Sequence, residues 1–206
     1  MKALVYINAF LLGTVLMSLE MLGSRYLGPY FGYTIHIWAG LISTVLAALA
    51  IGYFLGGYLA DRFESAMLLG ALVFLASAYV ALIPYFLDWV CLRVAFLVED
   101  PAIGGLVACA AILFVPLMSM AIFTPFGIRM VLLRSGKPGT VSGTIYGIST
   151  IGNIFGILFT TFYLIPRFGS RSITYGLAMA LLLCSLSFVI YSAITTGKRD
   201  IGEDKK

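Results

Sequence analysis

Six long apolar runs dominate this sequence and constrain its fold more than any other feature. Each run holds about 19–26 residues, enough for a helix rising 1.5 Å per residue to cross a hydrocarbon core of roughly 30 Å. Lipid offers no hydrogen-bond partner to a bare backbone, and continuous apolar character without strict alternation favours helices. We predict an all-α integral membrane protein with transmembrane helices at approximately 3–21, 36–60, 66–89, 104–126, 141–166 and 173–195.

Composition excludes several other classes of protein. Hydrophobic residues make up 61% of the 206 residues and charged residues 11%, whereas soluble domains have roughly 45–50% apolar and about 25% charged residues. The net charge of +4 comes from basic residues at loop ends, so we expect the lipid bilayer, and not nucleic acid, as partner. The three cysteines form no CxxC pair and no cluster with histidine, so we expect no metal and no cofactor.

The basic residues predict the orientation of the bundle. The first apolar run is longer than the core of a signal peptide and lacks a cleavage site, so we expect a retained span. We predict one membrane domain over 1–197 and a cytoplasmic tail over 198–206. We expect the protein in the plasma (inner) membrane, with both termini in the cytoplasm. This orientation places nine basic residues inside (Lys2, Arg62, Arg129, Arg134, Lys137, Lys198, Arg199, Lys205, Lys206) and four outside (Arg25, Arg93, Arg167, Arg171).

Two segments between spans are more than simple loops. Residues 91–99 are apolar with one arginine, and we expect a short helix in the outer interface. Residues 126–135 are predicted to extend the fourth helix toward the inner headgroups, with kinks at Pro116 and Pro125. Residues 136–139, Gly-Lys-Pro-Gly, predict a turn.

Glu20 is the one acid in the first apolar run. Arg25 is the nearest basic residue in sequence, but a spacing of five places the two side chains about 140° apart on a helix. His36 begins the second span and titrates near neutral pH in its ordinary environment. Two interpretations stay open: the charged residues extend to the interface, or they form a buried outer-leaflet site for a proton or cation.

The second span ends in a recognisable pattern. Small residues recur every fourth position at Ala48, Gly52, Gly56 and Ala60, which predicts a face for close helix contact. The span then ends on Asp-Arg. This resembles the signature between the second and third helices of the major facilitator superfamily, with Gly57, Asp61 and Arg62 at the matching positions. Glu64 and Ser65 depart from that signature, which usually has glycine and basic residues there.

The fifth span carries glycines together with polar residues. Asn153 lies near its middle, so its amide needs a partner in another helix or a water-filled cavity. Asn153 therefore either holds two helices together or lines a solute path.

The segment SLEMLGSRYLGPYFGYTIHIWAGLISTVLAALAIGYFLGGYLADR resembles the opening of the bacterial and archaeal membrane-bound spermidine-synthase-like proteins. These proteins join a facilitator-like membrane region to an aminopropyltransferase-like domain. The resemblance covers about 17–62 closely, and the fifth span and LIPRFGSR more loosely. The residues that match together are Glu20, Arg25, Pro29, Gly32, Trp38, Gly56, Gly57, Asp61 and Arg62.

The resemblance implies a bundle like one half of a major facilitator transporter. The family's soluble half carries a Rossmann-type fold, but no strand, glycine turn and helix unit occurs in this sequence, so we expect no enzyme activity from it. Three functions follow as hypotheses. The chain serves a separate aminopropyltransferase-like protein, by anchoring it or moving a polyamine-like cation; or it is a half-size transporter acting as a homo- or hetero-oligomer; or it is a scaffold without transport.

Overall fold

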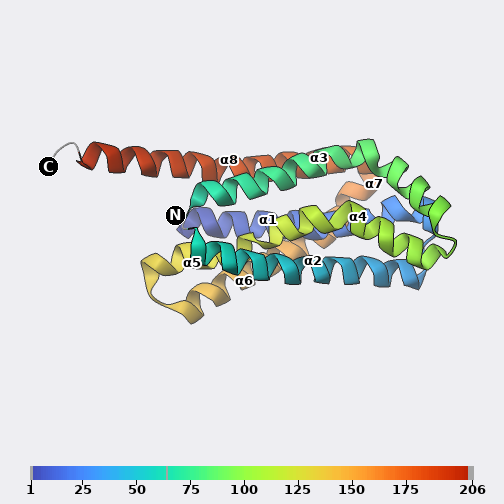
Figure 1. Cartoon of the computed structure of the whole chain (residues 1–206), viewed down its shortest axis with the longest axis horizontal. Coiled ribbons are helices and arrows are strands. Elements are labelled where there is room, and N and C mark those ends of the chain that lie inside the picture. The colour runs from blue at the N-terminus through green and yellow to red at the C-terminus, as the bar shows by residue number, and fades with distance from the viewer. Residues whose placement is uncertain (1, 64, 204–206) are drawn as a thin grey trace.

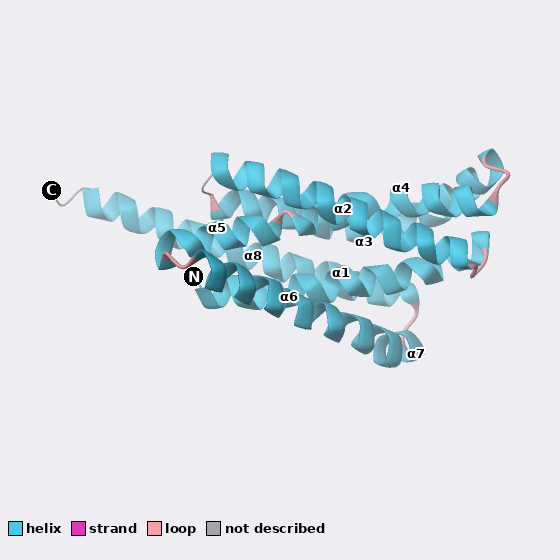
Figure 2. Cartoon of the chain, turned by 90° about the horizontal axis from the view of Figure 1, so that it is seen from below, coloured by secondary structure: helices cyan, strands magenta, loops and turns pink. Residues whose placement is uncertain are grey.

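The described part of the chain is helical almost throughout. The computed structural model describes residues 2–63 and 65–203, and their side chains other than those of 134–135 and 195–203. No strand occurs within this part, and loops lie at the ends of the helices (Figure 1, Figure 2). The elements are α1 (Lys2–Phe31), α2 (Ile35–Arg62), α3 (Ala66–Leu97), α4 (Pro101–Ala121), α5 (Phe123–Ser135), α6 (Pro138–Phe159), the π-helical turn η1 (Thr160–Leu164), α7 (Ile165–Arg167) and α8 (Ser170–Glu203).

Six helical segments among these residues are long and apolar enough to cross a bilayer. They correspond in order to the six predicted spans, so the prediction of a multi-pass, all-α membrane protein is confirmed. Their bounds are Lys2–Phe31, Ile35–Arg62, Ala66–Leu97, Pro101–Leu133, Pro138–Arg167 and Ser170–Ile194.

The central helix of the bundle is α1, which contacts all the other long helices. Around it, α2 packs on α4, α3 packs on α4 and α8, and α6 lies directly along α1. The chain begins and ends at the same end of the bundle (Figure 1). We call this end, which also holds the last turn of α2, the Arg62 end, and the opposite end the Phe31 end.

The first helix is longer than predicted. It was expected to end near residue 21 but runs to Phe31, because Glu20 is buried inside the bundle and does not mark the membrane boundary. Gly32 ends the helix with φ of +84°, a conformation that glycine adopts without steric cost, and its N–H donates to the carbonyl of Gly28 at 2.9 Å.

Two further boundaries differ from expectation. The predicted interfacial helix at 91–99 is not separate, because α3 continues through Pro84 to Leu97. The predicted extension of the fourth helix is present as α5, but it is divided from α4 at Ile122. Pro125 lacks the N–H that would bond to the carbonyl of residue 121, so the helical ladder is interrupted there. The turn predicted over 136–139 is shorter than expected: Gly136, whose φ is +62°, caps α5 and Lys137 follows it, but α6 already begins at Pro138.

The small-residue face of α2 packs as predicted against α4 and α5. A Cβ atom on Gly52 would lie 2.6 Å from the carbonyl oxygen of Met118. A Cβ atom on Gly56 would lie 2.7 Å from the carbonyl oxygen of Ile122. Real Cβ contacts are longer than this, so backbone reaches backbone at both glycines and larger residues are excluded.

A second close contact joins α1 and α6. Cβ atoms on Gly152 and Gly156 would overlap the backbone of α1 at Phe10 and Thr14. The Thr14 hydroxyl lies 3.2 Å from the carbonyl of Gly152, within hydrogen-bond distance. Hydroxyls can therefore link the two helices without charge, as expected for helix association in lipid.

The π-helical turn η1 was not predicted, although its cause is local. Pro166 cannot donate to the carbonyl four residues earlier, and the N–H of Ile165 bonds instead to Thr160, five residues earlier. Thr160 is fully buried, and its hydroxyl donates to Ser18 of α1 at 2.7 Å. The widened turn thus adds another hydroxyl contact between α1 and the span that contains α6.

Candidate functional site

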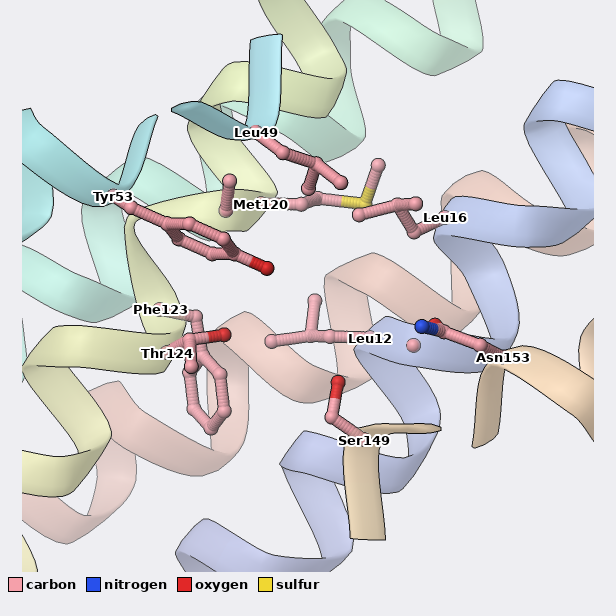
Figure 3. A pocket seen from close by; sticks show the side chains of 11 residues that line it. Leu12, Leu16, Leu49, Tyr53, Met120, Phe123, Thr124, Ser149 and Asn153 are labelled. Atoms are coloured by element: carbon pink, nitrogen blue, oxygen red, sulfur yellow. The ribbon is translucent and has the colours of Figure 1, made fainter. Parts of the chain in front are cut away.

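A polar cavity lies inside the bundle, where α1, α2, α6 and the junction of α4 with α5 approach one another (Figure 3). Its volume is about 30 Å³, close to the space that one molecule occupies in liquid water. Leu12 lies ten residues after Lys2, and Tyr53 lies nine residues before Arg62, so the cavity is about 15 Å from the Arg62 end. The site is therefore within the membrane and not at its surface.

Four polar side chains line this space. Figure 3 shows the polar ends of Tyr53, Thr124, Ser149 and Asn153 directed toward it, among leucine, methionine and phenylalanine side chains. Tyr53 of α2 and Thr124 of α5 lie close together on one side of this space. Ser149 and Asn153 are one turn apart on α6 and face the cavity from the opposite side.

Asn153 has an unsatisfied acceptor. Its Oδ1 is buried and has no hydrogen-bond partner in the described structure. A buried amide oxygen without a hydrogen bond costs about 1–3 kcal/mol in proteins, and more in hydrocarbon. Asn153 Oδ1 therefore does not hold two helices together, which was one of the two roles considered for this residue. The amide lines the cavity, with its nitrogen toward the space in Figure 3, and this position favours the other role, in which the amide contacts something in the cavity.

An aromatic contact lies beside the cavity. Tyr53, which lines the cavity, meets Tyr146 of α6 edge to face, with ring centroids 6.5 Å apart. Both tyrosines are partly exposed, whereas Leu12 and Thr124, which also line the cavity, are buried. The two rings bridge α2 and α6 at this point.

Glu20 is buried, with 8% of its surface exposed, while Arg25 and His36 are both exposed. Among the described residues no ion pair or hydrogen bond joins Glu20 to either of them. Glu20 instead lies near Cys109 of α4, which in turn lies near Thr44 of α2. The expected outer-leaflet group of Glu20, Arg25 and His36 is therefore not assembled as predicted.

The residues of the Asp-Arg motif contact different partners at the Arg62 end. Asp61 forms an ion pair with Arg129 of α5 at 3.4 Å, and the Asp61 side chain is 75% exposed. Arg62 donates to the hydroxyl of Tyr58 at 2.9 Å. No atom lies within 4 Å of a Cβ atom placed on Gly57. The motif thus ties α2 to α5; Glu64, which departs from the facilitator signature, lies outside the described residues.

Sequence reasoning found Asn153 but missed Tyr53 and Thr124 as its neighbours. The available signal was depth, because all three lie well inside apolar spans at a similar distance from the Arg62 end. A hydroxyl on an aromatic or threonine side chain is common in spans, however, and the residue types alone do not single these two out.

No family model, curated protein or solved structure matches this chain. The resemblance to the membrane-bound spermidine-synthase-like proteins accordingly remains an expectation that rests on the residues quoted for it.

Proposed function

We propose that this chain is a membrane-embedded subunit that moves a small solute with hydrogen-bond donors through the cavity of Figure 3. The observation that carries this proposal is the buried, unpartnered Oδ1 of Asn153. A scaffold that only packed helices together would have no use for a costly unsatisfied acceptor inside the bilayer.

The chemistry of the lining indicates the class of solute. An amide oxygen accepts hydrogen bonds, and the hydroxyls of Tyr53 and Ser149 can accept as well as donate. An amine or ammonium group supplies the donors that such a site needs. The cavity has room for the amino end of a polyamine-like molecule and not for the whole molecule, so the rest of the solute would extend beyond it.

The exposure of α6 supports an oligomer or a partner subunit. Of the most apolar stretch of its span, 17% is buried within the chain, against 56% for α1. Ser149 and Asn153 of α6 line the cavity, so a second membrane subunit placed against α6 would lie close to the solute. This arrangement agrees with the half-size facilitator hypothesis, in which two six-helix units surround a central site.

We assign any transfer chemistry to a separate aminopropyltransferase-like protein, as the sequence resemblance implies, and not to this chain. In this proposal the subunit lies in the plasma (inner) membrane with both termini in the cytoplasm, and it supplies or removes the solute of its partner. Copurification of a Rossmann-type protein in mild detergent tests the partnership separately from transport.

Flux in reconstituted vesicles tests the proposal directly. We expect uptake of labelled spermidine by the wild-type protein and at least a tenfold loss in Asn153→Leu, which removes the polar atoms and keeps the branched shape of the side chain. Thr150→Val is the matched control, because Thr150 is exposed on the same helix and its hydroxyl bonds to the carbonyl of Tyr146 in its own helix. Equal flux in Asn153→Leu and wild type would contradict the proposal.

A further inference from the structure

Glu20 has an unusual position for a charged residue. It lies eleven residues before the end of α1, about 16 Å from the Phe31 end, and it is more than nine-tenths buried. An ionised carboxylate at such a depth in a bilayer is expensive unless it is paired, coordinates a metal or is protonated. The structure allows these three possibilities to be compared.

Pairing is not available to Glu20 in the described structure. Arg25, the nearest base in sequence, is exposed on another face of α1. The ion pairs formed by Asp61 and Asp88 lie elsewhere and do not involve Glu20. On the helices packed around it, the one titratable group recorded as interacting with Glu20 among the described residues is the thiol of Cys109.

Metal coordination is also excluded by the residues present. Among the described residues no group of three or more histidine, cysteine or acidic side chains could hold an ion. Thr44 and Cys109 supply one hydroxyl and one thiol near Glu20, whereas hard cations take six or more oxygen ligands. Protonation is the remaining way to neutralise the carboxylate.

The register of α1 relates this acid to the polar cavity. Leu12 and Leu16 line the cavity, and Glu20 follows them at the same spacing of four on the same face of the helix. One turn, about 6 Å along the axis, separates Leu16 from Glu20. Glu20 therefore lies between the cavity and the Phe31 end of the bundle, beside Thr44 and Cys109, which occur at a similar depth in α2 and α4.

We propose that Glu20 is a proton-exchange site inside the bundle, neutral as the carboxylic acid and charged after it releases its proton toward the cavity or the Phe31 end. The site is distinct from the solute cavity. The proposal rests on the position of Glu20 and does not depend on whether the solute in the cavity is an amine.

Infrared spectroscopy of the full chain in lipid tests this proposal without a transport assay. We expect a carboxylic acid C=O band at neutral pH that is absent from Glu20→Gln and that converts to carboxylate as the pH is raised further. Arg25→Ala is the control, and it should leave the band unchanged. Replacing sodium with choline should also leave it unchanged.

Three results would overturn the proposal: a carboxylate band at every pH, an acid band that never converts, or conversion that depends on sodium. If Glu20→Gln does not fold, labelling of the wild-type protein with a lipid-soluble carbodiimide replaces it, because this reagent modifies protonated carboxyls within membranes. Mass spectrometry should then locate the modification on Glu20, with a yield that falls as the pH rises. A yield independent of pH, or no modification of Glu20, would contradict the proposal.

Discussion

The glycine contact between α2 and the α4–α5 corner allows a sharp prediction about stability. A Cβ atom on Gly56 would meet Pro125 Cγ at 2.6 Å, the Ile122 carbonyl oxygen at 2.7 Å and Ile122 Cα at 2.9 Å. Two of these atoms belong to backbone, which cannot rotate away as a side chain can. Gly56→Leu adds four carbon atoms at this point and must push the two helices apart.

The magnitude follows from the cost of overpacking. Extra methylenes in a packed core typically cost about 1–3 kcal/mol, and we expect Gly56→Leu at the upper end because backbone has to move. Leu55→Ala removes a side chain that is 40% exposed, and we expect a change within about 0.5 kcal/mol. Gly57→Leu is the closest control, since nothing lies within 4 Å of a Cβ atom placed there.

Thermal unfolding in detergent measures this difference. Cys91, Cys109 and Cys184 are all buried and free. A thiol-reactive fluorophore therefore reports unfolding when these thiols become accessible, and no cysteine has to be introduced. A loss of about 2–3 kcal/mol corresponds to a midpoint roughly 4–12 °C lower for Gly56→Leu than for wild type, with Gly57→Leu and Leu55→Ala near wild type. Equal midpoints for Gly56→Leu and Gly57→Leu would refute the packing argument.

Two other predictions concern topology and the α1–α6 contact. Reporter fusions after Lys137 and at the C-terminus should both read cytoplasmic, and one after Glu99 should read external; an external signal at either of the first two sites would overturn the orientation. Thr160→Val removes the buried hydroxyl that donates to Ser18 at 2.7 Å, and should lower stability by about 0.5–1.5 kcal/mol in the same unfolding assay. A midpoint unchanged from wild type would show that this hydrogen bond adds nothing to the α1–α6 interface.

The sequence predicted the spans and the small-residue face of α2 because both depend on local patterns. Apolar length alone identifies a membrane helix, and a repeat of small residues at a spacing of four identifies a face for close packing. The tertiary role of α6 was harder to predict. Gly152 and Gly156 contact α1 closely, while Gly139, Gly143 and Gly147 have open space around them, although all five belong to one glycine-rich run.

Errors in the prediction have a common physical cause. The first span was predicted to end near residue 21, but Glu20 is buried in the bundle and the helix continues to Phe31. The association of Glu20 with Arg25 followed from nearness in sequence, whereas Glu20 lies beside Cys109 of another helix. Contacts between helices depend on which faces meet, and a single sequence does not contain that information directly.

The most direct test of the central claim is whether the cavity is open to water and occupied by the solute. Ser149→Cys places a thiol on the cavity wall, and Ile151→Cys places one on the exposed, apolar face of the same helix. We predict that a water-soluble methanethiosulfonate reagent labels Ser149→Cys far faster than Ile151→Cys, and that spermidine slows the labelling of Ser149→Cys alone. Equal and slow labelling of the two variants, unaffected by spermidine, would contradict a solute site in this bundle.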